Sequence, residues 1–269
     1  MAGTGGPEAK SSGNLIVKLL TLARDLKRRK ARDRQHLFVC EGVRSVEELL
    51  RSPLTIRGAL TAPQLLEAPR GAQLAQALRD RGISVEPVEA KEFGSASETE
   101  SPQGVIAIAE IPTRSFAGLP DGWHGVVLAL DAVQDPGNVG AIVRAAAALG
   151  AAATVALPGT VDLWNAKVVR SGMGAHFRHL AFSGTWADLD TFRSASAVPV
   201  WVADGKGLPV TASGAPDRMI LVLGNEGAGV SDEAKSRAER SVAIPIAAEV
   251  ESLNVAVATG ILLHTLARP

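Results

Sequence analysis

Apolar runs alternate with helix-length segments through the second half of the chain. Each run is rich in aliphatic and β-branched residues and ends in small or polar ones, which is the pattern of a strand followed by a turn. The predicted strands are VVLALD (126–131), ATVAL (153–157), VPVWVAD (198–204), MILVLGN (219–225) and VAIPI (242–246). Helices are expected at 138–149, around 163–171, near 185–194, from 231 and at 252–267. Strands that alternate with helices predict an α/β fold whose mostly parallel sheet is covered on both faces.

The first half of the chain predicts a smaller α/β unit. A basic amphipathic helix is expected over 14–32, where leucines recur near helical spacing at 15, 19, 22 and 26. Strands and helices then alternate in the order HLFVCEG (36–42), VRSVEELL (43–50), TIRGAL (55–60), AQLAQALRDRG (72–82), ISVEPVE (83–89) and QGVIAIAE (103–110). Residues 111–124 contain prolines and glycines without periodicity, so they are the predicted linker. The expected boundaries are therefore a flexible tail over 1–13, a first domain over 14–110 and a second over 125–269.

The charge of the chain is balanced overall but not locally. Lys+Arg and Asp+Glu both number 28. Between residues 18 and 34, however, only Asp25 and Asp33 oppose a run of basic residues, namely Lys18, Arg24, Lys27, Arg28, Arg29, Lys30, Arg32 and Arg34. One interpretation of this run is a contact with phosphate groups, and the other is a solvated helix face. Composition alone gives the two about equal weight.

Composition also bears on the class of protein. A hydrophobic share of 46% with 21% charged residues is typical of globular domains. Cys40 is the single cysteine, which rules out an intrachain disulfide and a multi-cysteine zinc site and agrees with a reducing compartment. The sequence has no run suited to a membrane helix, and its first residues lack the apolar core of a signal peptide. We therefore expect a cytoplasmic protein without a membrane partner.

Three turns that follow predicted strands carry polar residues. DPGNVGAIVR (135–144) has Asn138 at the expected N-cap of a helix and Arg144 six residues later. LGNEGAGVS (223–231) places Glu226 between glycines, where it either accepts hydrogen bonds from a neighbouring loop or binds a substrate. ESLN (251–254) places Ser252, a possible N-cap, and Asn254 at the start of the last helix. Taken singly, Asn138 is better explained as a cap, but ligands of open α/β sheets bind where strands end and helices begin. Together the turns predict one composite polar site and an enzyme.

Several familiar motifs are missing. There is no G-x-G-x-x-G fingerprint at a helix start and no G-x-x-x-x-G-K-[ST] loop, which disfavours a nucleotide-dependent oxidoreductase and a nucleoside triphosphatase. There is no G-x-S-x-G elbow, which disfavours serine hydrolysis. His176 and His179 lack an HExxH context, so no metal is expected there. The tryptophans at 123, 164, 186 and 201 are expected in the core rather than in a base-stacking platform.

The motifs taken together resemble the SpoU-type (TrmH-like) RNA 2′-O-ribose methyltransferases of the SPOUT superfamily. The resemblance lies in DPGNVGAIVRAAAALG, LVLGNEGAGVS and IPIAAEVESLNVAVATGILL, in that order, with KVVRSGMGAHFR (167–178) between the first two. FVCEGVRSVEELL and SPQGVIAIAE resemble the small RNA-binding domain that precedes the catalytic domain in many members. The chain departs from the pattern at Ala248, where the third motif usually has glycine, and we expect the methyl group to be tolerated.

The resemblance implies features that the pattern of strands does not. Spacing alone predicts an unknotted sheet, because knots are so rare. Members of this family instead thread their C-terminal segment through a loop to form a trefoil knot, in which S-adenosylmethionine lies bent. They are generally homodimers with an active site completed across the interface. The first domain, 14–110, would bind RNA, and 125–269 would be the SPOUT methyltransferase domain.

The resemblance also implies roles for individual residues. Arg144 would bind the target phosphate and help to deprotonate the ribose hydroxyl, although its high pKa makes it a poor base and favours a clamping role. The catalytic set would be Asn138, Arg144, Glu226, Ser252 and Asn254. The cofactor would be held by Ala203, Asp204, Gly205, Leu223, Gly224, Asn225, Ile244, Ile246 and Leu253. RNA would be contacted by Arg28, Arg29, Lys30 and Arg44.

The predicted activity is therefore S-adenosylmethionine-dependent 2′-O-methylation of a ribose in structured RNA. The N-terminal domain and its basic helix favour ribosomal RNA over transfer RNA. Two alternatives remain open, a transfer RNA ribose methyltransferase and a non-catalytic RNA-binding assembly factor on the same fold. The complete set of five polar residues argues against the second alternative. Neither the nucleotide nor a housekeeping or antibiotic-resistance role follows from the sequence.

Overall fold

A computed structural model describes residues 17–210 and 214–266 of the chain. These residues form two compact units. The first unit contains the chain up to Pro112 together with the segment Trp164–Arg170, and the second contains Thr113–Leu163 and the chain from Ser171 onward. The flexible tail predicted over 1–13 lies outside the described residues. Within the described ranges no helix is long and apolar enough to cross a membrane.

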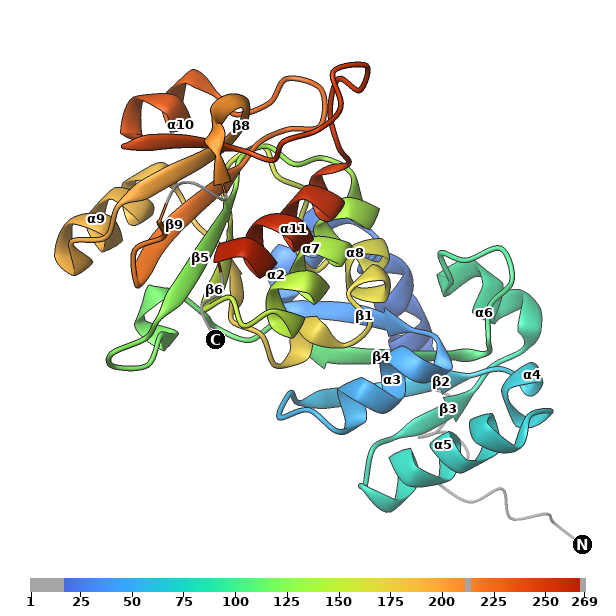
Figure 1. Cartoon of the computed structure of the whole chain (residues 1–269). Helices are drawn as coiled ribbons and strands as arrows, with labels where there is room; N and C mark the ends of the chain where they lie inside the picture. Colours follow the sequence, from blue (N-terminus) through green and yellow to red (C-terminus); the bar gives the residue numbers. More distant parts are fainter. Residues whose placement is uncertain (1–16, 211–213, 267–269) are drawn as a thin grey trace, which may run out of the picture. The chain divides into compact units, whose positions relative to one another are not determined.

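The first unit is a mixed sheet with helices around it (Figure 1). Its strands are ordered β1-β4-β2-β3, with β4 antiparallel to β1 and β2 and with β2 parallel to β3. The strand bounds are β1 Leu37–Glu41, β2 Ile56–Thr61, β3 Val85–Pro87 and β4 Val105–Glu110. The helices are α2 Arg29–Gln35, α3 Val43–Leu50, α4 Pro63–Leu66, α5 Pro69–Asp80 and α6 Ala90–Ala96. All four predicted strands are confirmed, whereas the short helices α4 and α6 were not expected.

The single basic helix predicted over 14–32 is wrong, because the described chain breaks there. Residues 17–25 are helical, Arg28 is extended, and α2 begins at Arg29 and continues to Gln35. The break is stabilised by Arg32, whose buried side chain donates hydrogen bonds from Nη1 to the carbonyls of Leu26 (2.7 Å) and Lys27 (2.9 Å). These carbonyls have lost their helical partners at the break, so an arginine is used to satisfy them.

Trp164 belongs to the hydrophobic core of the first unit although it lies far along the chain. Its ring is 4.5 Å from that of Phe38 on β1, centroid to centroid. Val168 and Val169, on α8 (Ala166–Ser171), are also fully buried. The tryptophans at 123, 186 and 201 are likewise at most 9% exposed, so the prediction that these side chains are core residues is confirmed.

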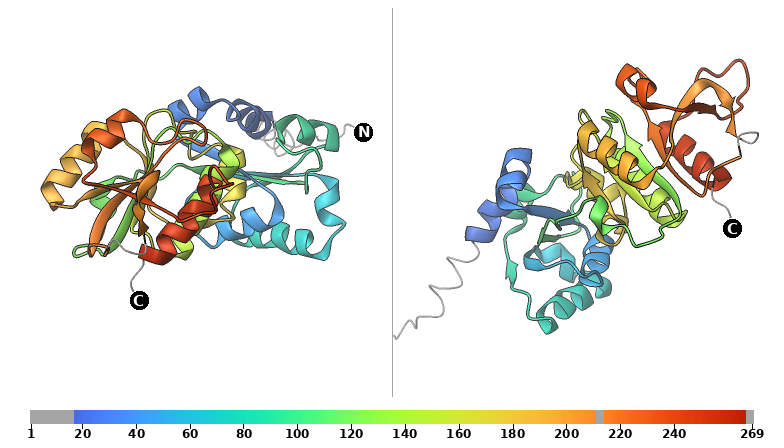
Figure 2. Two further views of the ribbon diagram at one scale, coloured as in Figure 1. Left: turned by 45° about the horizontal axis from the view of Figure 1, so that its top comes forward. Right: turned by 90° about the vertical axis from the view of Figure 1, so that its left-hand side faces the viewer.

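The second unit contains a six-stranded sheet in which every pairing is parallel. The prediction of a mostly parallel sheet is confirmed, and β7 is a strand that was not among the five predicted ones. The strand order is β10-β8-β9-β5-β6-β7. Figure 1 labels β8, β9, β5 and β6, and Figure 2 gives two further views of the same ribbon. The bounds are β5 Gly125–Leu130, β6 Ala153–Ala156, β7 Ala181–Ser183, β8 Val200–Pro209, β9 Arg218–Leu223 and β10 Arg240–Ala243. The helices are α7 Pro136–Ala148, α9 Trp186–Ser196, α10 Asp232–Arg237 and α11 Val255–Leu266, with 3₁₀ turns η1 Phe116–Gly118 and η2 Ala175–Phe177.

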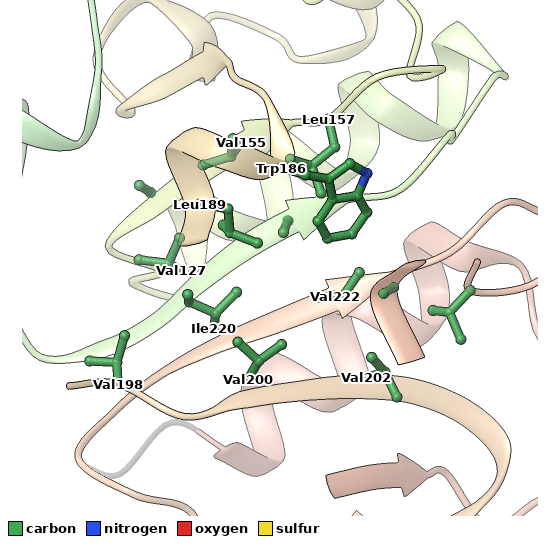
Figure 3. Close-up of a cluster of buried hydrophobic side chains, with 14 of the residues drawn as sticks. Val127, Val155, Leu157, Trp186, Leu189, Val198, Val200, Val202, Ile220 and Val222 are labelled. Atoms are coloured by element: carbon green, nitrogen blue, oxygen red, sulfur yellow. The ribbon is translucent and has the colours of Figure 1, made fainter. Parts of the chain in front are cut away.

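Helices cover both faces of this sheet. On one face, alternate residues of the central strands form a cluster with Trp186 and Leu189 of α9 and Ala234 of α10 (Figure 3). On the other face α7 and α11 pack side by side (Figure 1). The two-sided burial explains why the strands read as continuous apolar runs rather than as alternating ones. Because the strands are parallel, the loops that follow β5, β9 and β10 lie at the same edge of the sheet.

Candidate active site

A cavity of about 390 Å³ lies beside residues 203–205 in the middle of β8, at the ends of β9 and β10 and at the start of α11. It lies at the carboxyl edge of a parallel sheet, the usual ligand position in this class of fold. Its walls contain all the residues that the sequence assigned to a cofactor: Ala203, Asp204, Gly205, Leu223, Gly224, Asn225, Ile244, Ile246 and Leu253. Glu226, Glu251 and Ser252 also line it, whereas Asn138, Arg144 and Asn254 do not.

At Gly224 two backbone segments of the cavity wall approach each other closely. A Cβ at Gly224 would lie 2.2 Å from the carbonyl carbon of Gly229, because Asn225 and Gly229 exchange two backbone hydrogen bonds of 2.9 Å. Gly207 does not line the cavity, but a Cβ there would also lie 2.6 Å from backbone atoms of Ser241 and Val242, where the pairing of β8 and β10 shifts register. Side chains are therefore excluded at both positions, and at Gly224 the wall presents backbone groups.

Three of the five predicted catalytic residues form one directed chain of hydrogen bonds. Asn254 donates from Nδ2 to Oδ1 of Asn138 (2.9 Å), and Asn138 donates from Nδ2 to Oε1 of Glu226 (3.0 Å). Glu226 also accepts from the backbone amides of Gln134 and Asp135, both at 3.3 Å. Of the two interpretations of Glu226, acceptance of hydrogen bonds from a neighbouring loop is therefore what the structure contains.

The charge state of Glu226 follows from these contacts. Partial burial opposes ionisation, but the hydrogen bonds from Asn138 and from the backbone amides outweigh it, and the pKa of the carboxyl lies below its usual value. Glu226 is thus a carboxylate at neutral pH. With its oxygens already accepting from three donors, it is suited to fixing loops rather than to taking a proton.

Both predicted helix caps are wrong by a few residues. The N-cap of α7 is Asp135, whose Oδ1 accepts from the amide of Asn138 (2.8 Å), so Asn138 lies inside the first turn and its side chain is free to join the hydrogen-bond chain. On α11, Oδ1 of Asn254 accepts from the amides of Ala256 (2.9 Å) and Val257 (3.3 Å). Ser252 precedes this capping position, is exposed and lines the cavity.

Arg144 takes no part in the chain of hydrogen bonds. It follows Asn138 by six residues on α7, which is roughly 9 Å along the axis and about 120° around it. Its side chain is exposed, and no hydrogen bond or ion pair with another described residue holds the guanidinium. The structure therefore leaves Arg144 outside the hydrogen-bond chain and accessible to an anion.

Asp131, which directly follows β5, is a residue of this region that was not predicted from the sequence. Its carboxylate is 4% exposed and accepts from the amide of Ser231 (2.7 Å), while Ser231 itself caps α10. Asp131 thus ties the end of β5 to the segment that follows Glu226. The signal in the sequence was an acidic residue at the end of an otherwise apolar strand, a position where burial needs a hydrogen-bond partner.

The basic residues of the first unit are less uniform than the sequence suggests. Arg28 pairs with Asp25 (2.5 Å) and Arg29 with Asp33 (3.7 Å), while Lys30 and Arg44 are exposed. Lys27 donates to the carbonyls of Ser95 (2.8 Å) and Ser97 (2.7 Å), and Arg32 is buried. The last two side chains are therefore structural, which reduces the basic surface of this segment.

His176 and His179 lie in the core of the second unit. His179 shares a hydrogen bond of 2.9 Å with Thr154, and Arg114 donates to the carbonyls of both histidines. Burial lowers the pKa of His176 to about 3 and that of His179 to about 4, and the nearby charge of Arg114 adds to the effect. In the described ranges no group of three or more His, Cys, Asp or Glu residues is arranged to hold a metal.

Comparison with known proteins places this geometry in a family. Residues 125–264 match the model of the SpoU rRNA Methylase family, and residues 16–107 match that of the MRM3-like substrate binding domain. A 23S rRNA (guanosine(2553)-2′-O)-methyltransferase, RlmP, of Bacillus subtilis is 32% identical over 88% of this chain and 91% of its own. The chain belongs to the SpoU rRNA methylase family. The motifs that define the turns around the cavity are thus family motifs.

Further relatives agree with this assignment. A 23S rRNA (adenosine(1067)-2′-O)-methyltransferase of Streptomyces laurentii is 37% identical over 74% of this chain and 75% of its own. The crystal structure of an AdoMet-bound rRNA methyltransferase from Sinorhizobium meliloti superposes with a TM-score of 0.78 at 29% identity, covering 92% of this chain and 93% of that one. The SpoU-type assignment made from the sequence is confirmed.

Proposed function

We propose that this SpoU family member transfers a methyl group from S-adenosylmethionine to the 2′-hydroxyl of a ribose in ribosomal RNA. The observation that carries the proposal is the cavity beside β8 and the ends of β9 and β10, whose lining includes every residue that the family resemblance assigns to the cofactor. The names of the Bacillus and Streptomyces relatives supply the substrate class, 23S ribosomal RNA. Those two relatives modify different nucleotides, so the target nucleotide is left open.

The residues of the cavity fit S-adenosylmethionine. Leu223, Ile244 and Leu253 offer apolar surface, and the glycines at 224 and 205 leave backbone groups at the wall. Such a site holds a flat base and ribose through apolar contacts and backbone hydrogen bonds. The lining residues include acidic side chains and none that is basic, which suits a ligand with cationic groups. When bound, the cofactor would supply an electrophilic methyl group on its sulfonium.

We assign two different tasks to the family-motif residues around the cavity. Arg144 would clamp a phosphate beside the target ribose, since its guanidinium is permanently charged and offers a planar fork of donors. Asn138, Glu226 and Asn254 would hold the three turns in register, because their side chains bond to one another. Ser252 lines the cavity and would orient the substrate at its edge.

The roles of the two domains are also part of the proposal. We infer that 14–110 forms an RNA-binding domain and that 125–269 is the methyltransferase domain, with the segment 111–124, predicted as a linker, joining the second unit from Thr113 onward. The match of the MRM3-like substrate binding domain to 16–107 supports the first assignment. Lys30 and Arg44, with Arg28 and Arg29, would contact the RNA backbone. A cytoplasmic location would suit a protein that acts on ribosomal RNA.

We further propose that the C-terminal segment is knotted and that two copies form a dimer. The strand order β10-β8-β9-β5-β6-β7 and the packing of α11 on α7 support a threaded C-terminal segment. For the dimer, the supporting observation is an apolar face of α11 in which Val257 is 53% exposed and Ile261 is 38% exposed. These residues are four apart and lie on one side of the helix. Sedimentation that shows only monomers at micromolar concentration would contradict the dimer.

Calorimetry with S-adenosylmethionine and a transfer assay with labelled cofactor test the function. The expected result is saturable binding, followed by incorporation of label into ribosomal RNA that resists alkaline hydrolysis, as a 2′-O-methylated ribose does. Failure to bind the cofactor would favour an RNA-binding assembly factor instead. Incorporation into transfer RNA alone would overturn the substrate class but not the reaction.

A further inference from the structure

The side chain of Asn225 makes three hydrogen bonds to the surrounding backbone. Its Nδ2 donates to the carbonyl of Ala132 (2.9 Å), and its Oδ1 accepts from the amides of Gly227 and Ala228, both at 2.9 Å. The orientation of the amide is fixed, because only the oxygen can accept from two N–H groups and only the nitrogen can donate to a carbonyl. Asn225 lines the cavity, yet its polar atoms are directed to the backbone around it.

The partner of Asn225 is a residue with an uncommon backbone. Ala132 has a φ of 56°, in the left-handed region that residues with a side chain rarely adopt. It is also crowded, since a Cβ added at Gly159 would lie 2.8 Å from the Cβ of Ala132. Backbone strain of this kind persists only where neighbouring contacts impose it, and it gathers at functional sites. The hydrogen bond from Asn225 is one such contact.

A second hydrogen bond holds the same turn. Asp131, the neighbour of Ala132, is buried and accepts from the amide of Ser231 at 2.7 Å. Asn225 and Asp131 therefore fasten the segment 225–231 to the end of β5 at two points. Glu226 adds a third through the amides of Gln134 and Asp135. Because the backbone of 224–229 forms one wall of the cavity, these hydrogen bonds determine where that wall stands.

We propose that Asn225 is a positioning residue for the cofactor: its side chain holds the 225–229 turn against the left-handed Ala132 and so sets the backbone wall of the cavity, without itself binding the cofactor. This inference rests on the proposed function, because it takes S-adenosylmethionine as the ligand of the cavity. It differs from the role that family resemblance suggests, in which Asn225 touches the cofactor directly.

The test is calorimetric titration of the full-length chain with S-adenosylmethionine, accompanied by thermal unfolding of each variant. Asn225→Ala removes all three hydrogen bonds and should raise the dissociation constant by about tenfold or more. Asn225→Asp keeps the acceptor for Gly227 and Ala228 but puts an oxygen opposite the carbonyl of Ala132. It should show a loss of affinity between those of the wild type and Asn225→Ala.

A rescue separates positioning from direct contact. Glycine adopts the left-handed conformation without a steric penalty, so Ala132→Gly should restore part of the affinity lost in Asn225→Asp. Asn165→Ala serves as the matched control, because Asn165 makes a similar local bond, accepting from the amide of Lys167 (2.9 Å), in the other unit. Its affinity for S-adenosylmethionine should equal that of the wild type.

The possible results distinguish a failure of the positioning role of Asn225 from a failure of the proposed function. Partial rescue by Ala132→Gly in folded variants would support positioning. Wild-type affinity in Asn225→Ala, or a loss in Asn225→Asp that Ala132→Gly leaves unchanged, would overturn it. If Asn225→Ala does not fold, the Asn225→Asp pair decides alone. Absence of binding by the wild-type protein would overturn the proposed function, and this inference with it.

Discussion

The polar residues of the SpoU motifs fall into two groups that the structure holds very differently. Asn138, Glu226 and Asn254 are bonded to one another across three turns, and each has its amide or carboxylate engaged. Arg144 projects from α7 and is held by no hydrogen bond to a described residue. A residue whose side chain is held by hydrogen bonds within the protein can shape a site, whereas an exposed cation can bind a substrate. The contrast predicts which substitutions affect chemistry and which affect shape.

Arg144→Ala should have the largest effect on activity. We expect methyl transfer to fall roughly a thousandfold or more, because removal of a charge-assisted clamp costs several kcal/mol in the transition state. Binding of S-adenosylmethionine should be nearly unchanged, since Arg144 does not line the cavity. Single-turnover transfer and calorimetry measure the two separately. Arg144→Lys should restore little, because it keeps the charge without the bidentate geometry.

Two outcomes for Arg144→Ala would contradict the distinction between a substrate-binding arginine and residues that shape the site. Near-normal transfer by Arg144→Ala would show that the exposed cation has no part in the reaction. Loss of cofactor binding would place Arg144 in the cofactor site instead.

Glu226→Gln should have the next largest effect, and of a different kind. The amide nitrogen of glutamine would face either the backbone amide of Gln134 or, in the other orientation, the backbone amide of Asp135 and the Nδ2 of Asn138, which are all donors. We expect about 2 kcal/mol of lost interaction, seen as roughly a thirtyfold weaker affinity for S-adenosylmethionine. Glu239→Gln, a change of the same type at a residue that does not line this cavity, is the control. Unchanged affinity in Glu226→Gln would indicate that the wall stands without the hydrogen-bond chain.

The buried histidines give a smaller, pH-dependent effect on stability. Because the pKa values of His176 and His179 are lowered from 6.5 to about 3 and about 4, the folded state stays unprotonated where the unfolded state takes up protons. The two neutral histidines therefore make their full contribution to the free energy of unfolding above pH 6.5. This contribution decreases as the pH falls from 6.5 toward 4, by up to about 1.4 kcal/mol per pH unit for each histidine. In denaturant titrations, His176→Leu should reduce this slope by about half of the histidine contribution and leave stability above pH 7 independent of pH. An unchanged slope would contradict the buried, neutral histidine.

The basic segment of the first unit should give the smallest effect. Arg28→Ala, Arg29→Ala and Lys30→Ala together should weaken RNA binding and reduce the slope of log affinity against log salt, by about one for each phosphate that the variant no longer neutralises. The reduction should be below three, since Arg28 and Arg29 are paired with aspartates. Arg51→Ala, which removes an exposed arginine paired with Glu48, is the control. A salt slope equal to that of the wild type would remove this segment from the RNA interface.

Sequence analysis succeeded where one local signal determines the structure. Five of the six strands of the parallel sheet were predictable, because a strand buried on both faces must be an apolar run, whereas the three-residue β7 is too short to give that signal. The lining of the cavity followed from family motifs, whose glycines at 224 and 227 and short polar residues require one particular turn. For these features the local sequence contains the physical cause.

Features that depend on contacts between residues far apart in the sequence were harder to predict. The break at Arg28 depends on Arg32 binding carbonyls of the preceding helix, and periodicity continues across the break without a signal. The caps at Asp135 and Asn254 were misplaced by a few residues, because several residues of each turn have capping side chains. The links of Asn225 to Ala132 and of Asp131 to Ser231 join residues about ninety or more positions apart, so spacing cannot reveal them.

Mapping ribose methylation in ribosomal RNA from cells with and without the gene tests the central claim most directly. The account predicts that one or a few 2′-O-methylated nucleotides disappear with the gene, return with the wild-type protein and stay absent with Arg144→Ala produced at the same level. Ribosomal RNA whose ribose methylation is identical in all these cells would contradict it, as would full restoration by Arg144→Ala.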